Sequence, residues 1–180
     1  MNRTNPDSVF QGFLKRQFEE GMALAAQSDL LDLIPQGSFP PDTYIAQYTC
    51  KGLVMGSDGS VQEAVRFLVG IHFPADYLRR RCHPPEVILL LEPVNVWHPN
   101  VSMDNPFICP GLLQPGTTLV QILYQVFEIL SFKKVNMRES DALNKRACSW
   151  CRQNIHRFPI DKRPLKRRTV GVQVARALKE

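Results

Sequence analysis

The sequence contains no uninterrupted run of eighteen apolar residues, the length that a membrane-spanning helix needs. Its longest apolar stretch, EVILLLEPVNVW, is shorter than that and carries glutamates. The first residues, MNRTNPDSVFQGF, lack the apolar segment of a secretory signal peptide. We therefore expect a cytoplasmic protein that does not enter a membrane.

Cysteine is scarce and odd in number, with five residues at Cys50, Cys82, Cys109, Cys148 and Cys151. An odd count without an export signal favours reduced thiols over disulfides. Cys148 and Cys151 form the one close pair, and neither a second pair nor a well-spaced His pair completes a zinc site. Residues three apart share a helix face, so the pair is interpreted as buried free thiols, and neither a metal nor a cofactor is expected.

Negative charge is scarce in the last part of the chain. Residues 131–180 hold 14 basic and four acidic residues, whereas residues 1–130 hold eight basic and 13 acidic ones. The basic residues are densest in DKRPLKRRTV. Such a cluster fits contact with nucleic acid, an acidic protein or an acidic membrane surface, and equally a solvated tail that aids solubility.

The first half of the chain reads as one helix followed by strands. Phe10, Phe13, Leu14 and Phe18 recur at helical spacing, with Asp7 or Ser8 as the cap. The segment LIPQGSFPPD is interpreted as a linker. Three apolar runs follow, separated by turn residues: TYIAQYTCKGLVM, VQEAVRFLVGIHF and PPEVILLLEPV. Runs of this kind predict an antiparallel meander.

The second half returns to helical periodicity. Apolar residues from Leu119 to Leu130 form a helical stripe, and Thr118 with Gln121 forms a capping box at its start. A further helix is predicted over 140–154, capped by Ser140 or Asp141, then an extended or loose segment over 155–170 and a short helix over 171–179. The order of elements predicts an α+β fold, a meander sheet covered by helices on one side. We expect one domain over 1–156 and a basic C-terminal tail over 157–180.

The stretch WHPNVSMDNPFICPG, from Trp97 to Gly111, has two interpretations. In the structural one, Trp97 is a core aromatic, His98 bonds to nearby backbone, and Cys109 is a small buried residue. In the functional one, Cys109 lies in an irregular surface loop, where its thiolate is a nucleophile and a thioester on it is a good acyl donor. Asn100 then supplies an uncharged donor for a developing oxyanion, or hydrogen bonds that hold the loop.

The residues around this loop resemble ubiquitin-conjugating enzymes. HPNV followed by ICPG resembles the family's active-site signature. Upstream, FPADYL and PPEVILLLEPVNVWHPNV resemble its Phe-Pro-x-x-Tyr-Pro and Pro-Pro-x-Val segments, and downstream PGTTLVQILYQVFEIL and ESDALNKRACSWCRQN resemble the helices after the active site. The motifs cover about residues 8–154 in collinear order.

The resemblance implies a fold with an N-terminal helix, a four-stranded antiparallel meander, an active-site loop and C-terminal helices. It also implies that an activating enzyme transfers a ubiquitin-like protein to Cys109 as a thioester, which then passes to a lysine of a target protein. Asn100 would support the loop and the oxyanion. Asp141 would orient the incoming amine, or serve as a helix cap. His98 and Pro99 would be structural.

Several departures from the family pattern qualify these expectations. Arg79, Arg80 and Arg81 replace the Phe that often meets RING ligases, so the need for a ligase stays open. The divergence resembles conjugating enzymes of bacterial operons, several of which serve antiviral defence. The alternatives are a non-catalytic binding module of the same fold and a basic nucleic-acid-binding domain. No nucleic-acid reader motif supports the latter.

Overall fold

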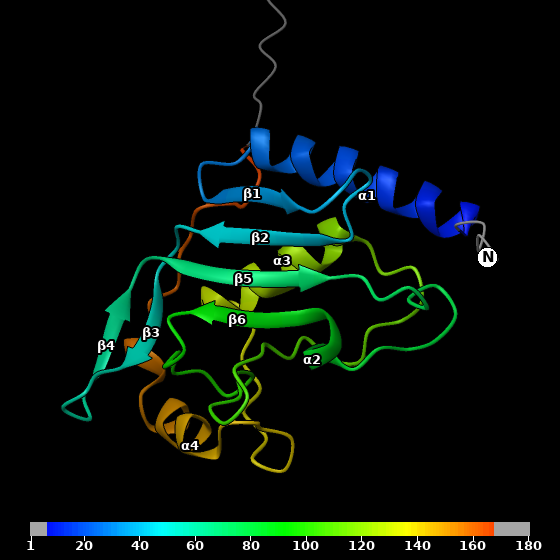
Figure 1. The fold of residues 1–180 in the computed structure, drawn as a ribbon. Coiled ribbons are helices and arrows are strands. Elements are labelled where there is room, and N and C mark those ends of the chain that lie inside the picture. Colours follow the sequence, from blue (N-terminus) through cyan, green and yellow to red (C-terminus); the bar gives the residue numbers. More distant parts are fainter. Residues whose placement is uncertain (1–6, 168–180) are drawn as a thin grey trace, which may run out of the picture.

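The computed structural model describes residues 7–167, which build a four-stranded antiparallel sheet with helices around it (Figure 1). The strands β1 (Leu31–Gln36), β2 (Thr43–Tyr48), β5 (Phe67–His72) and β6 (Ile88–Glu92) lie in that order across the sheet. The helix α1 (Ser8–Ala26) lies along the β1 edge, and α3 (Leu119–Leu130) packs behind the sheet. The α+β fold with its four-stranded antiparallel sheet is therefore confirmed.

The main core fills the space between the sheet and α3. Alternate residues of the central strands point inward and are buried, because side chains along a strand alternate between its two faces. These are Tyr44, Ala46 and Tyr48 on β2, Phe67, Val69 and Ile71 on β5, and Ile88 and Leu90 on β6. From α3, Leu119, Ile122, Leu123, Val126, Phe127 and Leu130 are buried against them.

The starts of both long helices follow the sequence prediction. The Asp7 carboxylate accepts hydrogen bonds from the Val9 and Phe10 amides at 3.1 and 3.2 Å, which caps α1. At α3, the Thr118 hydroxyl accepts from the Gln121 amide at 3.2 Å, and the Gln121 side chain accepts from the Thr118 amide at 2.8 Å. Each side chain satisfies an amide that has no partner inside its helix.

The strand region differs from the prediction in two places. The presumed linker LIPQGSFPPD includes most of β1, where Leu31 and Leu33 alternate into the core while Pro35 lies on an edge strand that tolerates proline. The first two apolar runs are each divided, and their inner parts form a separate hairpin of β3 (Gly52–Met55) and β4 (Val61–Ala64). The third run begins with a helical turn, α2 (Pro84–Val87), before β6.

Residues 93–118 form neither a helix nor a continuous strand. It is held instead by isolated antiparallel bridges, which pair Val96 with Val54, Phe107 with Leu89, Ile108 with Val101, and Leu113 with Cys82. These bridges tie the segment to the sheet, to the β3–β4 hairpin and to itself. Cys109 therefore lies in an irregular loop fixed on a rigid scaffold.

The helix α4 (Lys145–Gln153) starts later than predicted. Its N-cap is Asn144, whose side chain accepts from the Ala147 amide at 2.9 Å, so the prediction of Ser140 or Asp141 as the cap was wrong. Asn144 is buried and lies three residues before the buried pair Ala147 and Cys148, whereas 139–141 are exposed. The helix closes a second apolar cluster, which contains Leu53, Trp97, Phe132, Ala147 and Cys151.

Residues 158–167, which we call the C-terminal strap, run extended from the end of α4 back to the end of α1. Leu165 is buried in the main core. The Asp161 carboxylate, only 4% exposed, accepts from the Lys51 amide at 3.2 Å and pairs with Arg163 at 2.6 Å. Arg167 ends the strap by donating to the Ala26 and Gln27 carbonyls.

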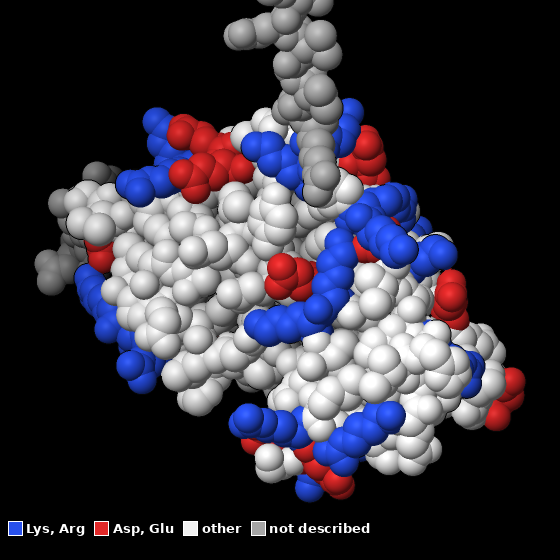
Figure 2. All heavy atoms as spheres, turned by 180° about the vertical axis from the view of Figure 1, so that it is seen from behind, with Lys and Arg blue, Asp and Glu red and all other residues white. Residues whose placement is uncertain are grey.

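The strap places basic side chains on the rear of the molecule (Figure 2). Lys162, Arg163, Lys166 and Arg167 are exposed, although Arg163 pairs with Asp161 and Arg167 lies 3.5 Å from Asp29. The division into a domain over 1–156 and a tail over 157–180 stays a prediction, and the predicted helix over 171–179 lies outside the described residues. None of the helices within residues 7–167 has the length and apolar character needed to cross a bilayer.

Candidate active site

Cys109 is the one cysteine of the five that is not buried. Its amide donates to the Asn100 carbonyl at 2.8 Å, which fixes the backbone on one side of the sulfur. The next residues, Pro110 and Gly111, leave any regular pairing, and Gly111 adopts a positive φ of 118° that a side chain would disfavour. The thiol thus sits partly exposed on a loop whose backbone is anchored.

The Asn100 side chain joins two segments of the site. Its Nδ2 donates to the Cys109 carbonyl at 3.2 Å, and its Oδ1 accepts from the Asn136 amide at 3.0 Å. One amide therefore holds the nucleophile loop against the segment that follows α3. In this arrangement Asn100 supports the loop. Its Nδ2 contacts the backbone carbonyl of the same residue that carries the sulfur.

His98 is a structural residue and not a base. It is fully buried, its ring lies edge-on to Phe132 with centroids 4.6 Å apart, and its Nδ1 accepts from the Asn100 amide at 3.0 Å. Burial lowers the pKa of His98 to about 3, and the nearby Lys134 backbone offsets this only in part. The contact with Lys134 falls short of a hydrogen bond, so Nε2 has no partner among the described residues. The ring is neutral and cannot reach the sulfur as a general base from inside the core.

Asp141 lies on an exposed turn that is joined to the His-Pro-Asn turn. The Leu143 and Asn144 amides donate to the buried Pro99 carbonyl at 3.0 and 3.2 Å. The Asp141 carboxylate accepts from the Ser140 hydroxyl at 2.9 Å and otherwise faces solvent. The structure therefore brings the three predicted site residues, Cys109, Asn100 and Asp141, onto adjoining loops that share Pro99 and Asn100 as their connection.

The segment between α3 and Asn136 also reaches the nucleophile loop. Phe132 takes a left-handed conformation with φ of 58°, and the Lys133 and Lys134 amides both donate to the Glu128 carbonyl. This turn sends the two lysine side chains in different directions. Lys134 Nζ donates to the Pro110 carbonyl at 3.3 Å, whereas Lys133 Nζ donates to the Arg163 carbonyl at 2.9 Å and lies over the Phe127 ring.

The buried cysteines are unsuited to nucleophilic chemistry. Burial raises the pKa of Cys50 and of Cys151 to about 12, and it also raises the pKa of Cys82. A thiol must ionise to attack a carbonyl or bind a metal, so these groups stay inert at neutral pH. Within residues 7–167 no group of three or more His, Cys, Asp or Glu side chains is placed to hold a metal ion.

A hollow of about 400 Å³ lies beside these loops. It is lined by Trp97, Met103, Asp104, Leu143, Asn144, Lys145 and Arg146. It therefore lies between the chain that leads to Cys109 and the start of α4, next to Asp141 in sequence. Its lining combines two cations, Lys145 and Arg146, with the carboxylate of Asp104 and with apolar side chains.

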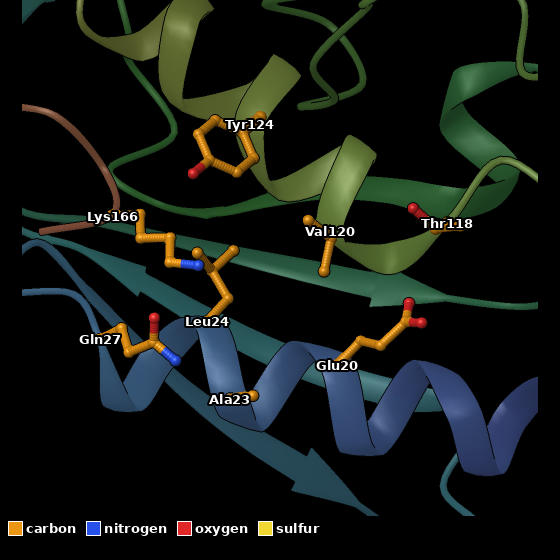
Figure 3. A pocket seen from close by; sticks show the side chains of 8 residues that line it. All are labelled: Glu20, Ala23, Leu24, Gln27, Thr118, Val120, Tyr124 and Lys166. Carbon is orange, nitrogen blue, oxygen red and sulfur yellow. The ribbon is translucent and has the colours of Figure 1, made fainter. Parts of the chain in front are cut away.

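A second hollow, of about 420 Å³, lies away from this site, between α1, α3 and the strap (Figure 3). Its residues are Glu20, Ala23, Leu24, Gln27, Thr118, Val120, Tyr124 and Lys166. None of them belongs to the loops around Cys109. It is a surface groove closed at one end by Lys166 and plays no part in the site described here.

Sequence reasoning missed three residues that organise the site. Asn136 receives the Asn100 side chain, Asn144 caps α4 beside Pro99, and Lys134 contacts the residue after Cys109. For Asn144 a signal existed, since an Asn before a run of helix-forming residues is a common cap. Nothing local to the sequence indicates that Asn136 or Lys134 lies near Cys109.

The search against protein-family models found no match. Among solved structures, the chain is similar to one described as a "Novel Ubiquitin-Conjugating Enzyme". The two share 17% identity with a TM-score of 0.53, and the match covers 82% of this chain and 88% of that one. Together with the helix, sheet and loop arrangement described above, this likeness shows that the chain has the fold of ubiquitin-conjugating enzymes.

Proposed function

We propose that this protein is a cysteine-dependent conjugating enzyme that carries a ubiquitin-like protein as a thioester on Cys109. The observation that carries the proposal is the placement of Cys109. It is the one unburied cysteine, it lies in a loop anchored by Asn100, and it does so on a fold shared with a ubiquitin-conjugating enzyme. The partners would be an activating enzyme, the ubiquitin-like protein and a lysine of a target protein.

Loading is a thiol exchange. The Cys109 thiolate attacks the carbonyl of the thioester on the activating enzyme, the C–S bond to that enzyme breaks, and its thiolate leaves. The partial exposure of Cys109 leaves its sulfur accessible to the activating enzyme. His98 is buried and neutral, and it has no role in this step.

Transfer replaces the C–S bond by an amide. A neutral lysine amine attacks the thioester carbonyl, negative charge develops on its oxygen, and the Cys109 thiolate leaves. Asn100 keeps the loop in register and, by releasing the Cys109 carbonyl, would offer its Nδ2 to the developing oxyanion. Asp141, exposed on the adjoining turn, would orient the incoming ammonium group and accept its proton.

The hollow beside Asp141 supports the approach of the target from that side. It is next to both the Asp141 turn and the loop that carries Cys109, and Lys145 and Arg146 line it. Asp104 lines it as well, so a target segment that carries both signs of charge would fit these residues. We propose that the acceptor chain lies in this hollow.

The biological setting we propose is a bacterial operon, of the kind that serves antiviral defence, with the enzyme in the cytoplasm. The support is the divergence of the sequence around its motifs, in particular Arg79, Arg80 and Arg81. Arg79 pairs with Asp7 at 2.7 Å, and Arg80 pairs with Asp76 and Glu86. Two of the three arginines are thus engaged by carboxylates, which makes this surface unlike an apolar ligase-binding one.

The test is a loading assay with a matching activating enzyme, its ubiquitin-like protein and ATP. Wild type should give an adduct on a gel that disappears with reductant. Cys109→Ser should give an adduct that survives reductant, because an ester replaces the thioester, and Cys109→Ala should give none. Cys50→Ala is the matched control, since that cysteine is buried in the main core.

Absence of any adduct with wild type, alongside binding of the ubiquitin-like protein, would replace this proposal by the non-catalytic binding module. An adduct that persists in Cys109→Ala would move the nucleophile elsewhere. Salt-dependent binding of nucleic acid without any adduct would favour the basic nucleic-acid-binding domain.

A further inference from the structure

Lys134 is an exposed amine held against the nucleophile loop. Its Nζ donates to the carbonyl of Pro110, the residue that follows Cys109, at 3.3 Å. Its position does not depend on its own side chain, because its amide is bonded to the Glu128 carbonyl and Asn136, two residues later, is bonded to Asn100. The backbone on both sides of Lys134 is therefore fixed against the site.

The segments that carry Cys109 and Lys134 are also joined by one side chain, that of Asn100. Asn100 donates to the Cys109 carbonyl and accepts from the Asn136 amide, so it spans the gap between the two segments. The Lys134 side chain joins the same two segments at Pro110, one residue after Cys109. An acyl group on the Cys109 sulfur would thus form beside an amine of the same chain.

We propose that Lys134 is an acceptor for the acyl group on Cys109, so that the protein modifies itself at this residue. The proposal rests on the thioester function proposed above. A lysine side chain has four rotatable bonds, and release of the Pro110 carbonyl frees Nζ to swing toward the sulfur. Holding two reacting groups on one rigid frame makes their reaction effectively unimolecular, which raises its rate over reaction with an amine in solution.

The chemistry is balanced without a further reagent. The Lys134 ammonium group loses a proton to water, and its lone pair attacks the thioester carbonyl. The tetrahedral intermediate collapses, the C–S bond breaks, and the electron pair leaves on the Cys109 sulfur as a thiolate. The new C–N bond is an isopeptide that reductant does not cleave, and its surplus proton passes to water. The product occupies Lys134 and regenerates a free Cys109.

The neighbouring Lys133 provides a matched control. It has the same chemistry and adjoins Lys134, but its Nζ donates to the Arg163 carbonyl and lies 4.3 Å from the centroid of the Phe127 ring. Lys133→Arg and Lys134→Arg each keep the positive charge and a donor. Each removes only the amine that an acyl group can occupy.

The experiment uses a short peptide α-thioester of a small thiol, which exchanges with a reactive cysteine without an activating enzyme. The full chain is incubated with this peptide, and intact mass and peptide mapping follow the reductant-sensitive and reductant-resistant adducts. We expect a sensitive adduct at Cys109, followed by a resistant adduct at Lys134 that forms at a rate independent of protein concentration. Lys134→Arg should reduce the resistant adduct at least tenfold, and Lys133→Arg should leave it unchanged.

The outcomes separate the two proposals. If no sensitive adduct forms at Cys109 in this assay and none forms with the activating enzyme, the thioester function itself fails. If the sensitive adduct forms but the resistant one is missing, maps to another lysine such as Lys145, or grows with protein concentration, self-modification at Lys134 is overturned while the thioester function stands.

Discussion

The sheet region and the site region treat buried polar groups differently. In the sheet region each buried tyrosine hydroxyl has a partner, with Tyr48 donating to the Leu123 carbonyl at 3.0 Å, Tyr77 to Thr117 at 2.8 Å and Tyr44 to Pro41 at 3.2 Å. Four buried side-chain atoms have no partner among the described residues. Three of them, Trp97 Nε1, His98 Nε2 and Asn144 Nδ2, lie in the site region, and one, Gln125 Oε1, lies on α3. Each unpartnered buried group costs roughly 1–3 kcal/mol. Most of this cost therefore falls on the site region.

The two regions also use different forces. The sheet and α3 are held by alternating apolar residues, and their contacts follow from strand and helix periods. The loops around Cys109 are held by single hydrogen bonds from Asn100, Asn136 and Asn144 and by the Pro99 carbonyl. A substitution should thus affect mainly stability in the first region, and in the second region the geometry of the loops as well as stability.

The largest effect on stability is expected from Ile122→Ala in α3. This side chain is fully buried between α3 and the sheet, and its truncation leaves a cavity. We expect a loss of about 2–5 kcal/mol in the free energy of unfolding, measured by urea denaturation. A loss under about 1 kcal/mol would mean that the core beneath α3 can collapse around the cavity.

The next effect is a pH dependence that arises from His98. Its pKa is about 3 in the folded protein, against 6.5 for an unhindered imidazole, because burial disfavours the charged ring. Between these values the unfolded chain binds an extra proton, so stability falls as the pH drops from 6.5 toward 3, by at most about 1.4 kcal/mol per pH unit. Urea denaturation at pH 6.5, 5.5 and 4.5 should show a steeper decline for wild type than for His98→Gln. Parallel declines would show that the ring takes up a proton without unfolding.

Asn100→Ala should separate loop support from chemistry. It removes the hydrogen bonds to the Cys109 carbonyl and the Asn136 amide, which we expect to cost about 1–3 kcal/mol of stability. If Asn100 also stabilises the oxyanion, single-turnover assays should show transfer to lysine slowed by about 10²–10³, and more than loading is. Equal slowing of both steps would leave Asn100 with the structural role alone.

Asn144→Ala should have a moderate effect. It removes the cap of α4, which satisfies the Ala147 amide, and caps of this kind contribute about 1 kcal/mol. Asn144→Asp keeps the acceptor and is the matched control, and thermal unfolding of the two variants gives the comparison. If the aspartate variant is as unstable as the alanine one, the Nδ2 side of the amide matters more than the cap.

Asp141→Ala should leave stability within about 0.5 kcal/mol of wild type, because the side chain is exposed and its hydrogen bond is to the neighbouring Ser140. Its effect should appear only in discharge of the loaded enzyme to free lysine. We expect slower discharge near pH 7 that recovers in part near pH 9, where more of the amine is already neutral. The same ratio to wild type at both pH values would exclude a role in deprotonating the amine.

Local patterns were enough to predict much of the fold and the irregular loop that carries Cys109. The cap at Asp7, the capping box at Thr118 and Gln121, and the irregular loop around Cys109 all follow from neighbours in sequence. The roles of Asn136 and Lys134 could not be predicted, because each depends on a turn at Phe132 whose left-handed conformation has no local signal. The prediction of a linker over β1 was wrong. The Pro, Gly and Ser residues there indicated a turn, whereas the strand was indicated only by the alternation of two leucines.

The strap was the hardest part to anticipate. A segment with five basic residues among His156–Arg167 is typical of a solvated tail, yet Asp161 is buried in it. Asp161 accepts from the Lys51 amide and Arg163 donates to the Thr49 carbonyl, each across more than a hundred residues. Contacts across such separations depend on the whole fold, and they produce no periodic pattern of apolar residues in the sequence. An Asp–Arg pair two residues apart with a single apolar residue after it is too common to indicate docking.

The strap also bears on how the protein is made. Arg167 binds the Ala26 and Gln27 carbonyls at the end of α1, so the first helix acquires its last contacts from residues synthesised about 140 positions later. A ribosome releases the chain from its N-terminus, and α1 and the sheet will have emerged long before these partners exist. The nascent protein must therefore hold its earliest elements together without the strap, and the last contacts of α1 form only after the strap itself has emerged.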